Sequence, residues 1–503
     1  MVVYFVKQYK LKKEVEEMEI KNVWFCRSTS QYGAISYFIN QMIEGFKACG
    51  INADVIKYVD LDEAGHLKGL TDSDLIFSFN GGVNDLGEFR ESFNRDGIPC
   101  WIYMLDHPYH HYDRFSNIRR KQIVSVMDRK HLEYLENHYP EIGCKVFVAH
   151  GGSAAERMDI AFKDKCYDIV FFGTYTKPQS CMGCFDKYDE TMKKLLIKIA
   201  DDVWNGKETT LEDSVTHNFN ENHILEKHLF ENQGAIVDIM PYLCGLDGYI
   251  RNKKRDLLIR TALKAGYEVH VFGIGWEDFE DYEGNNLYIH DNVDYAESLD
   301  IMANSKIVLN NMPLLTDGSH DRIFSALACG GICLTDANPY LKENFIDGQD
   351  LFYYDWNSIS EMPQMIKKIM TGSINADEVI KSGRKKVLEK HMWYHRAKEI
   401  LEYCRQIEFC DEEGEKSEKT EHTEVRNVLN MMEEILDFID KNGENIKKEE
   451  LENLYQDVIE TFYSVNEELF QTKESMWFKL ENRRDHAETE FFRNWIDYIR
   501  GFI

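Results

Sequence analysis

Short apolar segments alternate with helical stretches along most of the chain, and this alternation limits the possible folds more than any other feature. In the first third of the chain the apolar segments are residues 22–26, 53–58, 74–79, 99–105, 122–127 and 145–149. Most of them are separated by stretches with helical spacing of apolar residues, such as 33–49 and 130–139. Buried strands that alternate with helices form a parallel sheet covered on both faces. The pattern predicts a Rossmann-like α/β domain over residues 21–152.

The alternation restarts at residue 167 and predicts a second Rossmann-like domain over residues 153–380. Its expected strands are residues 167–172, 267–272, 287–290, 306–309, 331–335 and 351–354. Its expected helices are residues 255–264, 295–303, 321–329 and 361–370, and a helical insertion is expected at about 187–243. Open α/β sheets bind ligands at the carboxyl ends of their strands. Two doubly wound domains in tandem therefore predict a cleft between them.

The remaining segments predict a charged leader over residues 1–20 and a crossover helix over 381–407. Residues 408–424 hold eight acidic and two basic side chains, which predicts a solvated linker. Residues 425–503 carry three helical stripes of apolar residues. These stripes predict a helical tail that packs on the chain itself or as a small bundle, with homo-oligomerisation or partner docking as the alternative.

Composition narrows the classes of partner. The chain has 59 basic and 88 acidic residues and a formal net charge of −29, which disfavours a broad nucleic-acid surface. No segment approaches the ~18 consecutive apolar residues of a membrane-spanning helix. The start of the sequence does not have the pattern of a signal peptide. We therefore expect a cytoplasmic protein, without a transmembrane segment, whose 12 cysteines are thiols.

Several motifs of nucleotide and metal chemistry are absent or misplaced. Neither first strand–helix turn, at 27–33 and 173–177, carries a dinucleotide-binding glycine pattern, and no phosphate-binding P-loop pattern occurs. Asp72 and Asp74 resemble a metal-binding pair but precede their strand, so a helix-capping turn is the favoured interpretation. Cys181 and Cys184 form the only C-x-x-C pair, and a loop turn is favoured over a zinc or redox site. We expect no metal.

The segment from residue 273 to residue 336 carries the most information about chemistry. An expected strand ends in Gly273, Gly275 and Trp276, where glycine lets a ligand approach the backbone. An expected helix begins near residue 321 beside His320 and Arg322. A helix N-terminus with basic neighbours favours an anion. The alternative is a surface arginine and a capping histidine.

Residues 167–407 resemble the donor-binding half of GT-B glycosyltransferases, and most closely the group named after a spore maturation protein (family 1/4-like). The segments that carry the resemblance are residues 168–173, 255–260, 271–276, 322–331 and 391–396. Residues 21–150 fit only a generic Rossmann-like acceptor domain, and residues 425–503 lie outside the resemblance. It implies a nucleotide-sugar donor, no further cofactor, and transfer without a metal.

The resemblance also implies roles for single residues. The nucleotide would be lined by Gly173, Gly273, Gly275 and Trp276, with His290, Asn292 and Val293 near the base and ribose. His320 and Arg322 would meet the pyrophosphate or the sugar. Asp317 and Ser325 stand where retaining relatives have two glutamates. This departure leaves ribose recognition and the stereochemical outcome open.

In the first domain, Asp106 and His107 directly follow a buried-type strand. Loops at the carboxyl ends of strands face the cleft, so these two residues are candidates for the acceptor base or a sugar contact. A capping turn or an adventitious metal site is the alternative. His150, Gly151 and Gly152 end the last strand of this domain, as an interdomain hinge or a plain connector.

Together these patterns predict a metal-independent hexosyl- or N-acetylhexosaminyltransferase. Its donor would be a nucleotide-diphosphate sugar, and its acceptor a protein or a cell-surface glycan. Two alternatives stay open at this point. One is a GT-B-like nucleotide-sugar epimerase, and the other is a catalytically silent partner subunit of a glycosylation complex.

Overall fold

The structure is a computed structural model that describes residues 20–407 with short gaps. The gaps are residues 29, 57–60, 62–66, 83–89, 118–120, 140–141, 157–159, 187–189, 207–209, 222–234, 281, 283 and 313. The expected leader (except Ile20), linker and tail lie outside the described residues. Described residues up to 211 and from 243 onward form one compact unit, and those between 212 and 242 belong to a second. None of the helices in the described part is long and apolar enough to cross a membrane.

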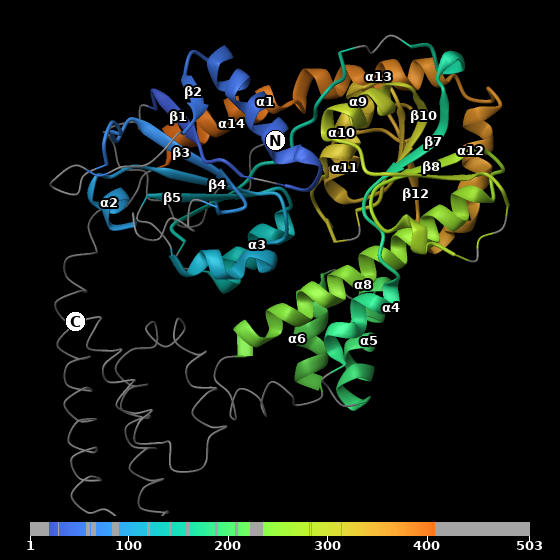
Figure 1. Ribbon diagram of the computed structural model, residues 1–503, viewed down its shortest axis with the longest axis horizontal. Coiled ribbons are helices and arrows are strands. Elements are labelled where there is room, and N and C mark those ends of the chain that lie inside the picture. Colours follow the sequence, from blue (N-terminus) through green and yellow to red (C-terminus); the bar gives the residue numbers. More distant parts are fainter. Residues whose placement is uncertain are drawn as a thin grey trace, which may run out of the picture. The chain divides into compact units, whose positions relative to one another are not determined.

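The first domain is a six-stranded parallel sheet. Its strands are β1 (Asn22–Phe25), β2 (Asn52–Val55), β3 (Asp74–Phe79), β4 (Cys100–Met104), β5 (Gln122–Val126) and β6 (Cys144–Phe147), in the order β2-β1-β3-β4-β5-β6. Every residue of β3, β4 and β5 is buried, as expected for a sheet with both faces covered. Its helices are α1 (Ala34–Ala48), α2 (Arg90–Arg95) and α3 (Arg129–His138). Figure 1 shows this sheet in blue and teal.

The second domain repeats the plan with another six-stranded parallel sheet. Its strands are β7 (Tyr167–Phe172), β8 (Val269–Phe272), β9 (Leu287–His290), β10 (Ser305–Leu309), β11 (Ile332–Asp336) and β12 (Phe352–Tyr354), in the order β12-β11-β10-β7-β8-β9. Around it lie α9 (Tyr295–Ala303), α10 (Asp321–Ala328), α11 (Pro339–Asn344), α12 (Met362–Met370) and α13 (Ala376–Lys390). The predicted fold class of two Rossmann-like domains is confirmed.

Both sheets have a topological switch point, where the strand order reverses direction. In the first sheet it lies between β1 and β3, and in the second between β7 and β10. Crevices that bind ligands in doubly wound sheets open at the carboxyl ends of the strands at this point. The loops that follow β1, β3, β7 and β8 are therefore the places where a site is expected.

The helical insertion differs from the prediction at its end. The structure has α4 (Pro178–Cys181), α5 (Glu190–Trp204), α6 (Leu211–Glu221) and α8 (Ala235–Leu263). The separate helix predicted at 255–264 is wrong, because these residues are the last turns of α8. Gly245 lies within α8, and the helix continues through it. A Cβ at this position would lie 2.7 Å from the sulfur of Cys184 and 2.7 Å from the ring of Phe185. Glycine at this position allows close packing instead.

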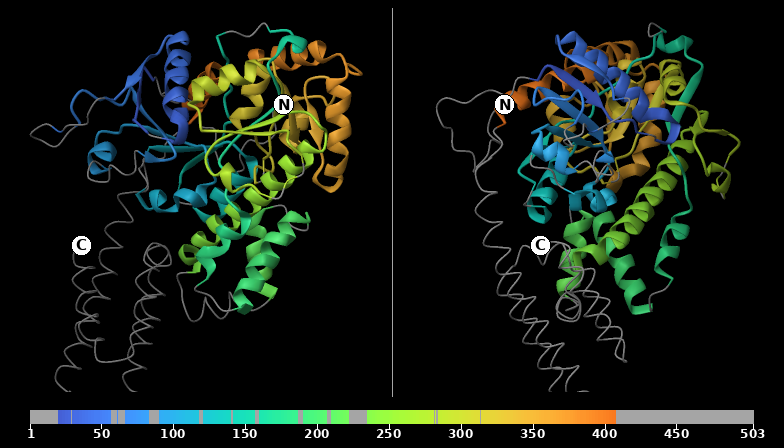
Figure 2. Two further views of the ribbon diagram at one scale, coloured as in Figure 1. Left: turned by 45° about the vertical axis from the view of Figure 1, so that its right-hand side comes forward. Right: turned by 60° about the vertical axis from the view of Figure 1, so that its left-hand side comes forward.

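The predicted single crossover helix over 381–407 is two helices. α13 packs on α10 of the second domain, whereas α14 (Trp393–Gln406) packs on α1 of the first domain. The break falls at His391 and Met392, and the backbone N–H of Gly152 donates to the carbonyl of His391 at 2.7 Å. α14 lies beside α1 in Figure 1 and in both views of Figure 2. Gly45 of α1 makes this contact close, because a Cβ there would lie 3.0 Å from the Cβ of Ala397.

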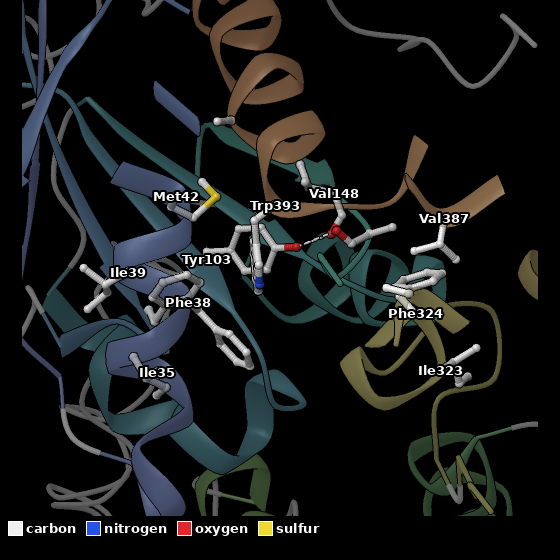
Figure 3. Packing of buried hydrophobic residues seen from close by; sticks show 14 of the residues in the cluster. Ile35, Phe38, Ile39, Met42, Tyr103, Val148, Ile323, Phe324, Val387 and Trp393 are labelled. Carbon is white, nitrogen blue, oxygen red and sulfur yellow. Dashed lines mark hydrogen bonds between the residues drawn. The ribbon is translucent and has the colours of Figure 1, made fainter. Parts of the chain in front are cut away.

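Trp393, the first residue of α14, fills the core of the first domain (Figure 3). Its ring lies 4.9 Å from that of Phe38, 5.8 Å from Phe79 and 5.9 Å from Tyr103. A side chain at Gly151 would overlap the Trp393 ring. The glycine pair after β6 therefore lies where the chain of the first domain meets the returning helix.

We predict that Trp393→Ala destabilises the protein by ~3–5 kcal/mol, because truncating a buried tryptophan leaves a large cavity. Its neighbour Tyr394 is 44% exposed and serves as the matched control. Tyr394→Ala should change stability by no more than ~0.5 kcal/mol. Urea unfolding followed by tryptophan-independent far-UV circular dichroism measures both. Equal effects of the two substitutions would contradict the role of Trp393 in the shared core.

Candidate active site between the two sheets

A cavity of about 270 Å³ lies between the carboxyl ends of the two sheets. The first domain lines it with residues that follow β1, β3 and β4. The second domain lines it with the ends of β7 and β8, the loop before α9, and the start of α10. Its polar lining includes Ser30, Tyr32, Asn80, Asp106, His150, Asn292, Ser298, His320, Asp321 and Arg322. The cavity therefore lies at both switch points.

Two arginines make one side of this region cationic. Arg322 lines the cavity and is 9% exposed; its Nη1 donates to Oδ1 of Asn310 at 2.8 Å, and its guanidinium lies 5.4 Å from the centre of the Phe171 ring. Arg255 of α8 donates through Nη1 to the carbonyl of Thr174, and its Cζ would lie 3.4 Å from a Cβ at Gly173. Neither arginine forms an ion pair with a described residue, so the pair is suited to an anionic ligand.

The electrostatics of the two arginines agree with this geometry. Burial, followed by the positive charges of Arg251 and Arg322, lowers the pKa of Arg255 to about 9. Burial also lowers the pKa of Arg322. The Nε of Arg255 is buried and has no hydrogen-bond partner in the described part of the chain. An anion beside the two arginines would offset the free-energy cost of burying their charge and the repulsion between them.

For the start of α10 the sequence left two interpretations open: an anion site, or a capping histidine beside a surface arginine. The structure has features of both. His320 caps the helix, with its Nδ1 accepting from the backbone N–H of Arg322 at 3.3 Å, and it also lines the cavity. Arg322 is not a surface residue. Asp321 is buried, and burial raises its pKa. The neighbouring His320, His150 and Arg322 outweigh burial and hold the pKa of Asp321 well below its usual range.

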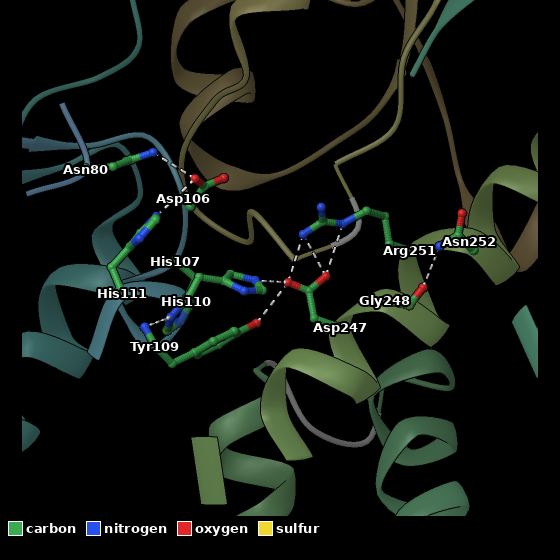
Figure 4. Close-up of polar contacts among 10 residues, drawn as sticks. All are labelled: Asn80, Asp106, His107, Tyr109, His110, His111, Asp247, Gly248, Arg251 and Asn252. Atoms are coloured by element: carbon green, nitrogen blue, oxygen red, sulfur yellow. Dashed lines mark hydrogen bonds and ion pairs between the residues drawn. The ribbon is translucent and has the colours of Figure 1, made fainter. Parts of the chain in front are cut away.

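Asp106, labelled in Figure 4, lies on the first-domain side of the cavity, two residues after the end of β4. Its Oδ2 accepts from Nδ2 of Asn80 at 2.8 Å and contacts Nε2 of His111 at 3.2 Å. Burial raises the pKa of Asp106, but the hydrogen bond and charge of His111, followed by His110 and Arg251, lower it overall. Asp106 is therefore an ionised acceptor at the wall of the cavity.

Seven of the predicted site residues line the cavity: Asp106, Gly173, Gly273, Asn292, Val293, His320 and Arg322. The other six, His107, Gly275, Trp276, His290, Asp317 and Ser325, are absent from its lining. The structure gives a packing or bonding reason for each of these six.

Trp276 and Gly275 pack against the chain after β7. Trp276 is fully buried, its Nε1 donates to the carbonyl of Gly173 at 2.7 Å, and its ring stacks on Tyr175 at 4.9 Å. Gly275 has φ +87°, and a Cβ there would overlap the carbonyl of Tyr175. The glycine–aromatic strand end therefore serves the packing of the loop after β7.

His107 and His290 are held by aromatic neighbours. His107 stacks on Tyr109 at 3.8 Å, and burial puts its pKa well below the usual value. The ring of His290 stacks on that of Phe272, with 4.4 Å between the ring centres. Nε2 of His290 lies 2.9 Å from Nδ1 of His270.

Asp317 is occupied by contacts with the first domain, and Ser325 by contacts within the second domain. Nη1 of Arg129 donates to Asp317 at 3.3 Å, and the backbone N–H of Asp317 donates to Oδ2 of Asp128 at 2.8 Å. Ser325 is fully buried; its hydroxyl accepts from the backbone N–H of Ser153 at 3.1 Å and lies 3.1 Å from the hydroxyl of Tyr295. Neither side chain is available to a ribose in this arrangement.

The lining residues that were not among the predicted site residues include Tyr32, Asn80, His150 and Asp321. Tyr32 and Asn80 have positive φ values of 66° and 50°, which the sequence does not reveal. Their position after β1 and β3, at the switch point, is the signal that could have found them. His150 stood in the sequence as a hinge or connector, and the structure puts it in the cavity wall as well.

A buried carboxylate on α8 joins the second domain to the histidine-rich loop of the first (Figure 4). Asp247 is 1% exposed and accepts from Nε and Nη2 of Arg251 at 3.1 and 2.8 Å. It also accepts from the hydroxyl of Tyr109 at 3.2 Å and lies 2.6 Å from Nε2 of His110. Burial lowers the pKa of His110, but its hydrogen bonds to Asp247 and Cys244 raise it to about 9.

The two weak metal motifs have local roles. Asp74 accepts from the backbone and hydroxyl of Thr71, each at 2.7 Å, and from Nε1 of Trp24 at 2.7 Å. It caps a turn before β3 and not a helix, which corrects the predicted helix cap. Cys184 donates to the carbonyl of Cys181 at 3.3 Å. Within the described ranges, no group of three or more His, Cys, Asp or Glu side chains is arranged to hold a metal ion.

We predict that Asp247→Asn destabilises the protein by ~3–5 kcal/mol, because it leaves Arg251 and His110 without their buried counter-charge. Asp201, which is 43% exposed and pairs with Lys253 at 3.1 Å, is the matched control. Asp201→Asn should cost less than ~1 kcal/mol. Urea unfolding at pH 6 gives both values, and similar losses would contradict the buried network.

The same network predicts a pH dependence of stability. The folded-state pKa of His110 is raised from 6.5 to about 9. The contribution of His110 to the free energy of unfolding is therefore fully present below pH ~6.5 and is lost as the pH rises through about 9. The wild type should lose stability between these two values, and Asp247→Asn should show a flatter profile in the same window. An unchanged slope in the variant would contradict the pairing.

Part of the second domain matches a known protein family. Residues 252–402 match a family model described as glycosyl transferase-like. A search of curated proteins gives no match.

Among solved structures, sucrose-phosphate synthase from Thermosynechococcus elongatus is 12% identical, with 77% of this chain and 98% of that chain covered and a TM-score of 0.44. HepE from Anabaena in complex with UDP and glucose is 9% identical, with 77% and 100% covered and a TM-score of 0.45. AviGT4, a glycosyltransferase involved in avilamycin A biosynthesis, is 11% identical, with 76% and 97% covered and a TM-score of 0.43.

The family model covers most of the segment on which the predicted resemblance rested, including α10 and most of α14. The narrower likeness to the spore-maturation group stays a prediction. At the level of the family the prediction is confirmed, because residues 252–402 match the glycosyl transferase-like family model.

Proposed function

We propose that this protein transfers a sugar from a nucleotide-diphosphate sugar to an acceptor hydroxyl. The observation that carries the proposal is the buried arginine pair, Arg322 and Arg255, neither of which forms an ion pair with a described residue. It lies at the switch point of a sheet whose sequence matches a glycosyl transferase-like family. A departing diphosphate is the anion that such a pair would stabilise.

The proposed reaction uses both walls of the cavity. The acceptor oxygen attacks the anomeric carbon, the bond from that carbon to the diphosphate oxygen breaks, and the acceptor proton moves to the carboxylate of Asp106. The nucleoside diphosphate leaves toward Arg322 and Arg255. Positioning of the two substrates and stabilisation of the leaving group would supply most of the rate enhancement.

The donor sugar is proposed to be a hexose or an N-acetylhexosamine, and the acceptor a protein or a cell-surface glycan. These two assignments rest on the resemblance stated from the sequence. The buried Ser325, in place of the glutamate of retaining relatives, favours ribose recognition by other groups. Asn292 and Ser298 of the cavity lining are the candidates. A cytoplasmic location stays a prediction.

The first experiment measures nucleoside diphosphate binding by calorimetry. We predict that Arg322→Ala weakens binding by ~1.5–3 kcal/mol, or roughly 10- to 150-fold, because one charge-assisted hydrogen bond is lost. The nucleoside without phosphates should bind the variant and the wild type equally. Arg260→Ala is the control, since Arg260 pairs with Asp256 at 2.7 Å on the same helix as Arg255 and does not line the cavity. An equal loss for both ligands would reject Arg322 as the diphosphate contact.

The second experiment tests metal independence, which follows from the cationic side chains near the leaving group. Transfer should continue in excess EDTA at an unchanged rate, because the arginines and not a divalent ion offset the diphosphate charge. Loss of transfer in EDTA, with recovery on adding Mg²⁺ or Mn²⁺, would show that this charge argument is wrong.

The same assay separates the alternative functions. Release of nucleoside diphosphate only in the presence of acceptor supports the transferase. Interconversion of the donor sugar without acceptor would instead identify an epimerase. Nucleotide binding without turnover in any mixture would identify a catalytically silent subunit.

A further inference from the structure

We propose that Asn80 is a positioning residue for Asp106, acting together with His111 and Arg114. The inference rests on the proposed function, because Asp106 is taken there as the group that receives the acceptor proton. It assigns a role to the loop after β3, which none of the family-like segments contains. The three side chains and Asp106 come from three separate stretches of the first domain: the end of β3, the loop after β4, and the short helix at Pro108–Asn117.

The backbone at Asn80 is held in an uncommon conformation. Asn80 has φ +50° and Gly81 has φ +73°, so two successive residues adopt the left-handed region. A residue with a side chain occupies this region at a cost, and asparagine tolerates it best. The N–H of Asn80 donates to the carbonyl of Tyr103 at 2.9 Å, and its own carbonyl accepts from Nη1 of Arg114. The turn is therefore fixed from both sides.

The side-chain amide of Asn80 has only one orientation that satisfies its neighbours. The backbone N–H of Leu105 can only donate, and it lies 2.7 Å from Oδ1 of Asn80. Oδ1 is therefore the acceptor, and Nδ2 is left to donate to Oδ2 of Asp106 at 2.8 Å. One amide thus bridges the backbone before Asp106 and the carboxylate of Asp106.

Arg114 fixes the second donor through the tautomer of His111. A guanidinium has only donors, and its Nη1 lies 3.2 Å from Nδ1 of His111. Nδ1 is therefore the accepting nitrogen, and the ring proton lies on Nε2. Nε2 then donates to Oδ2 of Asp106 at 3.2 Å. Figure 4 shows the contacts of Asn80 and His111 ending on the same oxygen.

This arrangement has two consequences for Asp106. Nδ2 of Asn80 and Nε2 of His111 both donate to Oδ2 of Asp106. Because Oδ1 makes no hydrogen bond to a described residue, it is the oxygen available to an acceptor hydroxyl. Donation to the carboxylate also favours its charged form. The titratable groups around it are His111, which acts through its hydrogen bond, and His110 and Arg251, which act through their charge; all of them lower the pKa of Asp106.

The test is Asn80→Gly, which removes both side-chain hydrogen bonds while glycine accepts the left-handed backbone without strain. The kcat should fall at least tenfold, with the KM for the donor unchanged. The acidic limb of the pH profile of kcat should move to higher pH, because the carboxylate loses a donor and its pKa rises. Asn80→Asp should move the limb further, since it brings a second carboxylate to Asp106.

Asn286→Gly is the matched control. Its side-chain amide also makes two hydrogen bonds, to the carbonyls of Leu263 and Tyr267 at 3.2 and 2.7 Å, but it does not line the cavity. It should leave the pH profile and kcat unchanged. A readout independent of turnover is carbon-13 NMR of labelled aspartate carboxyls, in which the Asp106 signal is identified by its loss in Asp106→Asn.

The outcomes distinguish the inference from the proposed function. An active wild type with an unchanged kcat, pH limb and Asp106 titration in Asn80→Gly would overturn the positioning role of Asn80. A wild type with no transfer from any donor would overturn the proposed function, even if the NMR titration of Asp106 moves as expected. A fall in kcat without a shift of the limb or of the titration would show a merely structural role and reject the inference.

Discussion

The site depends on one packing interaction, the insertion of Trp393 into the core of the first domain. α13 belongs to the second domain, and the chain turns at His391 so that α14 returns to α1. Gly45 and Gly151 lack the side chains that would block this return. One continuous cluster of buried apolar residues consequently spans both domains. The two sheets keep their carboxyl ends around a shared cavity because this core joins them on one side of it.

Polar contacts around the cavity divide into two kinds. Asp247 is matched by Arg251 and His110, and Asp317 is matched by Arg129, so these carboxylates tie one domain to the other. Arg322 and Arg255 have no such match in the described residues, although burying an unpaired guanidinium is costly. A chain with a net charge of −29 that leaves two buried arginines without an ion pair among its described residues presents a local anion site in an acidic protein. This contrast is the physical basis of the proposed diphosphate contact.

The sequence was sufficient for the two-sheet fold, because the central strands are largely apolar runs and most of these runs are followed by a helical pattern. It failed where packing decides: a separate helix was predicted at 255–264, yet α8 is continuous from Ala235 to Leu263, and Gly245 within it packs closely against Phe185. Trp276 reads as a ligand platform, yet it is buried against Tyr175. Asn80 was missed because a positive φ has no signature in a single sequence.

The most direct test of the account is a crystal structure of the full chain with a nucleoside diphosphate bound. We expect the diphosphate within hydrogen-bond distance of Arg322 and Arg255, between the ends of β7 and β8 and the start of α10. The cavity of about 270 Å³ should be wider in that complex, because nucleotide-sized ligands occupy sites of ~300–1,000 Å³. Density for the nucleotide at another place on the chain, with this cavity empty at saturating ligand, would contradict the account.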